Sequence, residues 1–309
     1  MSLHPQASAL LEALEEAPTI GPGSDPTELR ALMRVPPPEH PEAVGGLEDR
    51  LIPGPADPIP VRIYTPSGEG PFPLLVFFHG GGFVLCDLDS HDATCRALCN
   101  EATAVVVSVA YRLAPEHPYP AGPEDCFAAT CWAAGQAQAL GADARRLGVV
   151  GDSAGGCLAA AVTLMARQAG GPAIAFQGLI YPVTNCAFDT PSYRDNAQGY
   201  YLTREAMQWF WEQYLSDPAQ ADEPYASPLR AADLAGLPAA SLVTAGYDPL
   251  RDEGRAYGQA LAAAGVPVQL HHFARHFHGF AGMLGILDDA RPALRLIAGD
   301  FHSALDGTA

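Results

Sequence analysis

The hydrophobic residues of this chain recur in two alternating patterns, which together predict a mainly parallel sheet with helices on both faces. Short runs such as LLVFF (74–78) and AVVVSVA (104–110) are almost continuously apolar. Strands that are buried on both faces have this composition, because helices cover both sides of a parallel sheet. The expected strands are residues 61–65, 74–79, 104–110, 147–151, 176–181, 240–245 and 268–273.

Helical patterns lie between and after these runs. The expected helices are residues 124–139, 154–168, 252–264 and 288–304. Strands that alternate with helices are typical of the α/β class with a parallel sheet. Two segments interrupt the alternation, residues 1–50 and residues 184–235, and the first contains a short helix and a proline-rich stretch (VPPPEHPE, 35–42). We therefore expect a body formed by 51–183 and 236–309, with the other two segments outside it.

The segment 184–235 contains a predicted amphipathic helix at 204–215. Met207, Phe210, Trp211 and Tyr214 recur at i, i+3, i+4 and i+7, which places them on one apolar face. This face has two explanations that the sequence leaves open. It either packs the helix onto the body, or it closes a substrate pocket, to which Phe210, Trp211 and Tyr214 would then belong.

Composition excludes several classes of protein. The net charge is −18, and 17 lysines and arginines are too few for the basic surface that nucleic acid requires. The sequence contains no run of 18 uncharged apolar residues, so we expect no membrane span. The first 16 residues lack the basic start of a signal peptide, so we expect a cytoplasmic protein. The seven cysteines lack CxxC spacing, which favours reduced thiols.

The strongest candidate for chemistry is the sequence GDSAGG at 151–156. It follows a strand-like run and precedes a helical one, which is the context of a G-x-S-x-G turn. The serine of such a turn has a strained backbone, and the glycines let neighbouring segments pass closely. Ser153 is therefore expected at the carboxyl edge of the sheet, where α/β proteins bind ligands.

A second motif, His79-Gly80-Gly81-Gly82, follows the run LLVFF directly. Glycines without side chains let backbone amides approach a substrate oxygen, and acyl transfer needs such donors for its oxyanion. We assign the donors to Gly81, Gly82 and Ala154, the residue after the serine. His79 is expected to orient this loop rather than to move protons.

An acid and a base are expected after later strands, in the chain order Ser, Asp, His. Asp248 follows the run at 240–245, and His278 follows a histidine-rich stretch after the last predicted strand. Asp252 lies at a helix start, where an acid favours the helix dipole and needs no catalytic role. The stretch before the base also contains His276, so the choice between two histidines depends on the motif HGF at 278–280.

No cofactor or metal is expected from the sequence. HExxH and zinc-type cysteine spacing are absent, and so are GxGxxG and GxxxxGK[ST]. The histidine pair His272 and His276 would share a face only on a helix, whereas the pattern predicts a strand and a loop there.

Together these motifs resemble those of the hormone-sensitive-lipase-like esterases, bacterial family IV. The matching stretches are FFHGGGF (77–83), VSVAYRLAPEHPYPA (107–121), GDSAGG (151–156), YPV (181–183), TAGYDPLRDEG (244–254) and HGF (278–280). The resemblance implies an α/β-hydrolase sheet with a cap made of the N-terminal segment and an insertion after the sixth strand. It also implies the nucleophile Ser153, the acid Asp248 and the base His278, and hydrolysis of esters with short to medium acyl chains without a cofactor.

The expected partner is a small-molecule ester, and a homodimer is compatible with the sequence. An amidase or deacetylase acting through the same three residues is an alternative. A ligand-binding receptor of the same fold is disfavoured, because Ser153, Asp248 and His278 are all present.

Overall fold

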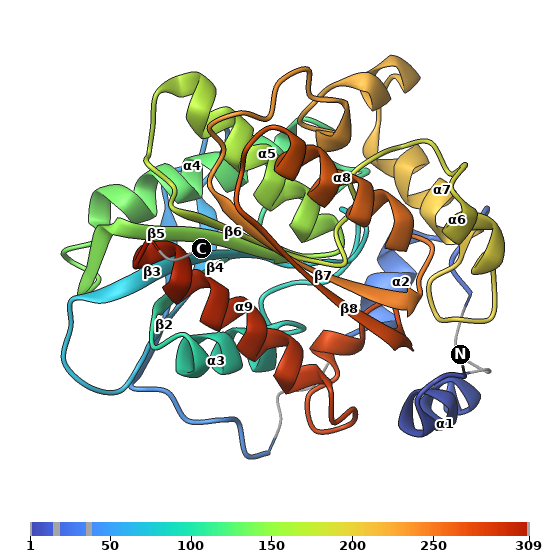
Figure 1. The fold of residues 1–309 in the computed structure, drawn as a ribbon, viewed down its shortest axis with the longest axis horizontal. Helices are drawn as coiled ribbons and strands as arrows, with labels where there is room; N and C mark the ends of the chain where they lie inside the picture. The colour runs from blue at the N-terminus through green and yellow to red at the C-terminus, as the bar shows by residue number, and fades with distance from the viewer. Residues whose placement is uncertain (1, 15–18, 35–38, 308–309) are drawn as a thin grey trace.

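The computed structural model describes all residues except 1, 15–18, 35–38 and 308–309. The described chain folds into an eight-stranded sheet of order β1-β2-β4-β3-β5-β6-β7-β8 (Figure 1). β2 pairs antiparallel with both β1 and β4, and the other neighbouring strands run parallel. The strands are β1 Gly46–Ile52, β2 Ile59–Thr65, β3 Phe72–Phe78, β4 Val105–Val109, β5 Ala142–Asp152, β6 Phe176–Ile180, β7 Ala239–Tyr247 and β8 Val268–Phe277.

Helices cover both faces of this sheet, as the sequence predicts for an α/β protein. The core splits into two apolar clusters, one beneath α4, α5 and α8 and the other beneath α3 and α9 (Figure 1). Every residue of β3, β4 and β6 is buried, since both of their faces contact a helical layer. These helices are α3 Asp92–Glu101, α4 Ala121–Gln136, α5 Ala154–Ala169, α8 Arg251–Ala263 and α9 Ala290–Leu305.

The remaining helices belong to the two segments that interrupt the alternation. They are α1 Pro5–Ala13, α2 Pro26–Leu32, α6 Pro191–Asp195 and α7 Arg204–Tyr214, with 3₁₀ turns at η1 Pro218–Asp222 and η2 Pro228–Arg230. A third 3₁₀ turn, η3 Phe280–Gly282, follows β8. α2 is held against the body by Arg30, which donates to the carbonyl oxygens of Val84 and Ala114.

All seven expected strands are present, and β1 and α3 are among the elements that were not expected. β1 lies across residue 50, the boundary expected between the N-terminal segment and the body, and only its last residue, Ile52, is buried. An edge strand with charged, exposed positions lacks the apolar run by which the other strands were found. α3 was also missed, although its polar residues Asp92, Arg96 and Asn100 recur at the spacing of one helix face. Part of the proline-rich stretch, residues 35–38, lies outside the described residues.

Within the described ranges, the structure contains no helix of the length and hydropathy that would cross a membrane.

Candidate active site

Ser153 occupies a sharp turn between β5 and α5. Its φ of 54° is unusual for a residue with a side chain, and this is the strained backbone that the G-x-S-x-G motif predicts. The turn is held because the Ser153 amide donates to the Ile180 carbonyl oxygen (2.8 Å). Ser153 caps the start of α5, where the partial positive charge of the helix favours a developing anion.

Two glycines make this turn sterically feasible. A Cβ at Gly151 would lie 2.1 Å from the carbonyl oxygen of Gly155, and one at Gly155 would lie 1.9 Å from that of Phe78. Both distances are far inside van der Waals contact, so the close approach of β3, β5 and α5 requires these residues.

Ser153, His278 and Asp248 form one chain of hydrogen-bond contacts, although they come from three separate loops. The Ser153 Oγ lies 2.9 Å from His278 Nε2, and His278 Nδ1 lies 2.8 Å from Asp248 Oδ2. Asp248 is fully buried, and its other carboxylate oxygen accepts the Leu250 amide (2.8 Å). The Asn196 side chain donates to the Asp248 carbonyl oxygen (3.2 Å), which ties this loop to α6.

The other histidines near the end of the chain have separate partners. His271 Nε2 lies 2.6 Å from Asp300, and His272 Nδ1 lies 3.0 Å from the Thr244 hydroxyl. His276 Nε2 lies 2.7 Å from Asp289, and the His276 ring stacks on His4. No three His, Cys, Asp or Glu side chains gather as metal ligands in the part of the chain that the structure describes.

Asp252, the second acid of the motif, faces the inserted segment 184–235 rather than His278. It accepts the backbone amide of Ser192 (2.8 Å) and pairs with Arg251. Burial would raise the pKa of this carboxyl, but the Arg251 and Ser192 hydrogen bonds lower it below its ordinary value.

The glycine loop after β3 lies against the Ser153 turn. Gly81 and Gly82 have φ values of 106° and 61°, which glycine adopts without strain. Among the described residues, the amides of Gly81, Gly82 and Ala154 donate no hydrogen bond to protein, so they are free to serve an incoming oxygen. His79 orients the loop, because its Nδ1 lies 2.8 Å from the Gly80 carbonyl oxygen and Tyr111 stacks on its ring.

The aromatic face of α7 divides between this loop and the body. The Phe210 ring covers Gly82 so closely that a Cβ there would lie 2.2 Å from it. Tyr214 instead stacks on Phe83 at a centroid distance of 3.8 Å, and Trp211 contacts the same ring at 5.8 Å. All three α7 side chains are buried, but Phe210 is the one that reaches the glycine loop.

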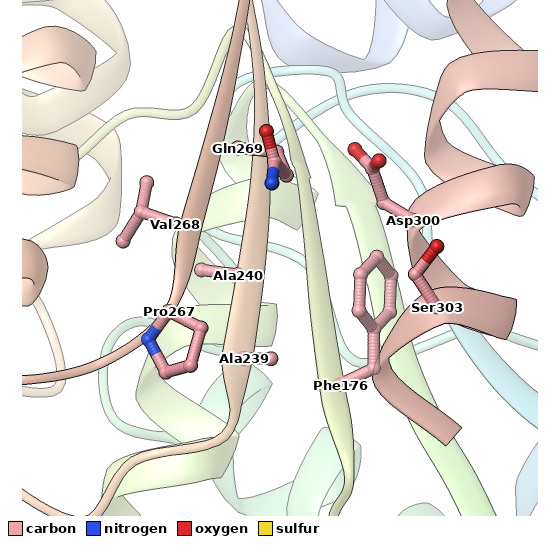
Figure 2. A pocket seen from close by; sticks show the side chains of 8 residues that line it. All are labelled: Phe176, Ala239, Ala240, Pro267, Val268, Gln269, Asp300 and Ser303. Carbon is pink, nitrogen blue, oxygen red and sulfur yellow. The ribbon is translucent and has the colours of Figure 1, made fainter. Parts of the chain in front are cut away.

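Two hollows lie outside the Ser153 turn. One, of about 60 Å³, lies where β6 and β7 begin and is bordered by Asp300 and Ser303 of α9 (Figure 2). The other, of about 350 Å³, borders the loop of the acid and includes Asn196, Tyr247 and Arg251 in its walls.

The chain matches known proteins over most of its length. Residues 75–282 match a family described as the α/β hydrolase fold. The chain is 47% identical to the esterase LipI of Mycobacterium tuberculosis over 269 residues, which cover 86% of this chain and 83% of that protein. It is 43% identical to the carboxylesterase NlhH of the same species over 239 residues, which cover 76% and 75%.

Solved structures extend this likeness to the whole chain. The hyperthermophilic esterase of Pyrobaculum calidifontis superimposes with a TM-score of 0.92 at 39% identity, covering all of both chains. The thermostable esterase of Pseudomonas putida superimposes with a TM-score of 0.90 at 36% identity, covering 98% of each. Fold, motifs and relatives agree, and the chain belongs to the hormone-sensitive-lipase-like family of the α/β hydrolases.

Proposed function

We propose that this protein is a serine carboxylesterase that hydrolyses short- to medium-chain acyl esters through a covalent acyl-enzyme. The observation that carries the proposal is the hydrogen-bonded series from Ser153 through His278 to Asp248, with contacts of 2.9 and 2.8 Å. The names of two relatives, esterase for LipI and carboxylesterase for NlhH, support the same reaction class.

In the first half of the reaction, the Ser153 Oγ attacks the ester carbonyl carbon while His278 Nε2 takes the hydroxyl proton. Asp248 holds the ring so that Nδ1 carries its proton and faces the carboxylate, which stabilises the imidazolium. The carbon–oxygen bond to the leaving alcohol then breaks, and His278 returns the proton to that alcohol. The acyl group remains on Ser153.

In the second half, His278 takes a proton from water, and the resulting hydroxide attacks the acyl carbon. In the collapse of the tetrahedral intermediate so formed, the bond between the acyl carbon and the Ser153 Oγ breaks, and His278 returns its proton to that oxygen. The carboxylic acid is released and the Ser153 hydroxyl is restored. Both tetrahedral intermediates place negative charge on the former carbonyl oxygen. The amides of Gly81, Gly82 and Ala154 donate to it, and the start of α5 adds its partial positive charge.

We propose further that residues 1–50 and 184–235 form a cap over this site, and that Phe210 limits the space beside the oxyanion loop. The Phe210 ring lies against Gly82. The acyl chain of a substrate whose carbonyl oxygen is bound by the Gly82 amide would therefore contact this ring within its first few carbon atoms.

Replacement of the nucleophile tests the reaction. Ser153→Ala should lower the turnover of an aryl acetate by roughly 10⁴-fold or more, because the three residues act as a unit. The measurement is kcat on chromogenic esters, together with melting temperature to show that the variant is folded. A folded variant that keeps more than about a tenth of the activity would refute the proposal.

The histidines offer a matched pair for the same assay. His278→Ala should be as inactive as Ser153→Ala, whereas His276→Ala should keep most of the activity and lose stability, since its ring is bonded to Asp289 and stacked on His4. If His276→Ala were inactive and His278→Ala active, the base would be His276 and not His278.

A further inference from the structure

The side chain next to the nucleophile, Asp152, takes part in the contacts that hold the glycine loop. Its Oδ1 accepts the backbone amide of Gly80 at 2.9 Å, and Gly80 directly precedes the assigned oxyanion donors. The fit is tight, because a Cβ at Gly80 would lie 2.5 Å from the other carboxylate oxygen. Asp152 therefore connects the Ser153 turn to the glycine loop through one hydrogen bond.

Asp152 is ionised despite its surroundings. Its side chain is 13% exposed, and burial alone would raise the pKa of the carboxyl. The charge of His91, its hydrogen bond and the Gly80 amide outweigh burial and lower the pKa below the ordinary value. A carboxylate in this position would repel an oxyanion that forms beside it, unless a neighbouring group offsets its charge.

His91 is that neighbour. Its Nε2 lies 3.2 Å from Asp152 Oδ1, and its side chain is also 13% exposed. An ionised carboxylate only accepts hydrogen bonds, so Nε2 must be the nitrogen that carries the proton in this contact. His79, whose ring lies 5.5 Å from that of His91, does not replace it, because burial and the charge of His91 lower the pKa of His79 to about 4.

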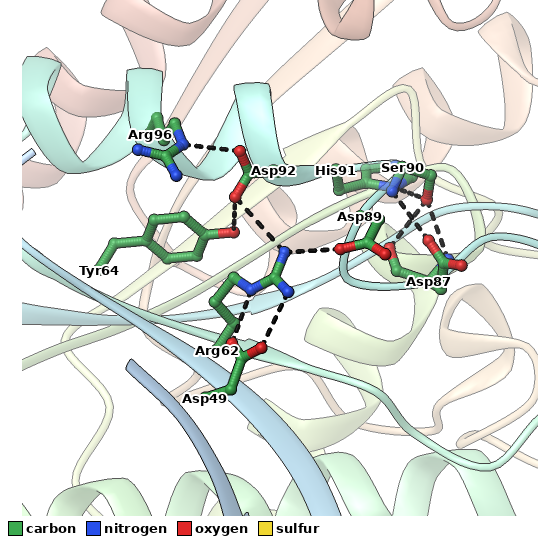
Figure 3. A network of polar contacts seen from close by, with 9 residues as sticks. All are labelled: Asp49, Arg62, Tyr64, Asp87, Asp89, Ser90, His91, Asp92 and Arg96. Carbon is green, nitrogen blue, oxygen red and sulfur yellow. Dashed lines mark hydrogen bonds and ion pairs between the residues drawn. The ribbon is translucent and has the colours of Figure 1, made fainter. Parts of the chain in front are cut away.

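Several contacts fix the loop that carries His91 (Figure 3). The Ser90 hydroxyl donates to the Asp87 carbonyl oxygen, so its oxygen accepts in the 2.9 Å contact with His91 Nδ1. Asp89 is held by Arg62 of β2, which also pairs with Asp49 of β1. The loop that carries the ring is therefore anchored to the antiparallel edge of the sheet, while the ring itself contacts Asp152.

From these contacts, and resting on the proposed esterase reaction, we propose that His91 is a positioning residue. It donates to Asp152, holds that carboxylate beneath the Gly80 amide, and offsets a negative charge that would otherwise oppose the oxyanion. The effect belongs to the transition state and not to substrate binding.

The test uses three variants, His91→Gln, Asp152→Asn and the double variant, assayed on an aryl acetate at about pH 7.5. His91→Gln should lower kcat about tenfold or more with little change in KM, a loss below the 10²–10³ of a lost oxyanion donor. Asp152→Asn should lose less, because the amide oxygen still accepts from Gly80 and carries no charge. The double variant should have a higher kcat than His91→Gln, since no unpaired carboxylate remains.

A merely structural role predicts the opposite order, with the double variant at or below both single variants, and this result would overturn the proposal. So would a His91→Gln variant that changes KM alone or keeps the wild-type kcat. Asp89→Asn is the control for loop order, since Asp89 lies in the same loop as His91 and its exposed side chain bonds Arg62 of β2 through an oxygen that an amide also offers. It should retain nearly full activity, and a loss equal to that of His91→Gln would also overturn the proposal.

A second measurement does not depend on turnover, so it separates failure of this inference from failure of the esterase proposal. Nitrogen-15 spectra of the histidine-labelled wild type, assigned with His91→Gln, should show a proton on His91 Nε2. A ring protonated on Nδ1 alone would overturn the inference, whatever Ser153→Ala shows.

Discussion

At the scale of single residues, two side chains of the same type can have different roles because their hydrogen-bond partners differ. Asp248 and Asp252 lie four residues apart, yet Asp248 contacts His278 while Asp252 accepts the Ser192 amide of α6. His276 and His278 differ in the same way, since one is bonded to Asp289 and the other to Ser153. Distance along the chain therefore says little about function in this stretch.

The two acids give the sharpest test at this scale. Asp248→Asn should lower kcat by several orders of magnitude, roughly 10⁴-fold as for other triads, because an amide at this position favours the wrong tautomer of His278. Asp252→Asn should keep most of the activity and lower the melting temperature. Both kcat and melting temperature are measured for each variant. Equal losses of kcat at equal melting temperature would show that Asp248 is not the acid.

At the scale of elements, α7 carries two kinds of aromatic contact on one face. Its N-terminus is capped by Thr203, whose hydroxyl oxygen accepts the Ala206 amide (3.0 Å). Its apolar face is buried. Phe210 lies on Gly82, whereas Tyr214 stacks flat on Phe83 and also meets Tyr119 edge-on. One helix therefore contacts both the aromatic residues Phe83 and Tyr119 and the glycine loop.

This division predicts different results for two truncations in α7. Phe210→Ala should improve longer acyl esters relative to acetate, by up to about 1–3 kcal/mol in kcat/KM per methylene accommodated. Tyr214→Ala should leave the preference unchanged and reduce stability by about 3–5 kcal/mol, as buried aromatic residues do. The measurement is kcat/KM from acetate to decanoate esters for folded variants. An unchanged profile in Phe210→Ala would mean that this face only packs the helix.

At the scale of the whole molecule, a buried acid connects helix α8 to the inserted segment 184–235. Glu253 lies in the first turn of α8, is 2% exposed, and accepts the amides of Thr184 and Asn185, where the insertion begins. Burial raises the pKa of Glu253 to about 8, because it outweighs the stabilisation that these two amides give to the carboxylate.

This raised pKa predicts a loss of stability toward alkaline pH. The folded state keeps the proton up to about pH 8, whereas the unfolded chain releases it above the ordinary value of 4.5. Between these values the folded state binds more protons, so stability is complete below 4.5 and falls as pH rises, by up to about 1.4 kcal/mol per unit. Glu253→Gln should remove this dependence.

The measurement is chemical denaturation of the wild type and Glu253→Gln at about pH 6 and pH 7.5. The wild type should lose up to about 2 kcal/mol more than the variant over this interval. His79, whose pKa is lowered from 6.5 to about 4, also changes stability in the lower part of this window, because the unfolded chain still binds its proton there. That contribution is the same in both proteins, so it cancels when the variant is compared with the wild type. Parallel losses in the two proteins would contradict the assignment.

The α/β class, the seven apolar strands and the positions of the two glycine motifs could be predicted from the amino-acid sequence alone. These features are local: an apolar run of five to seven residues, or a serine between glycines after a strand, is fixed by sterics and burial over a few neighbouring positions. The chain order of Ser153, Asp248 and His278 was readable for the same reason, since each follows a strand that could be recognised.

Only the tertiary structure decided which side chains meet across long separations. β1 became part of the sheet by pairing with β2, although most of its residues are not buried. The contact of His91 with Asp152, and of Phe210 with Gly82, joins residues 61 and 128 positions apart. Such contacts depend on strand register and on how helices pack over the sheet, and no periodicity of hydrophobic and polar residues encodes either of them.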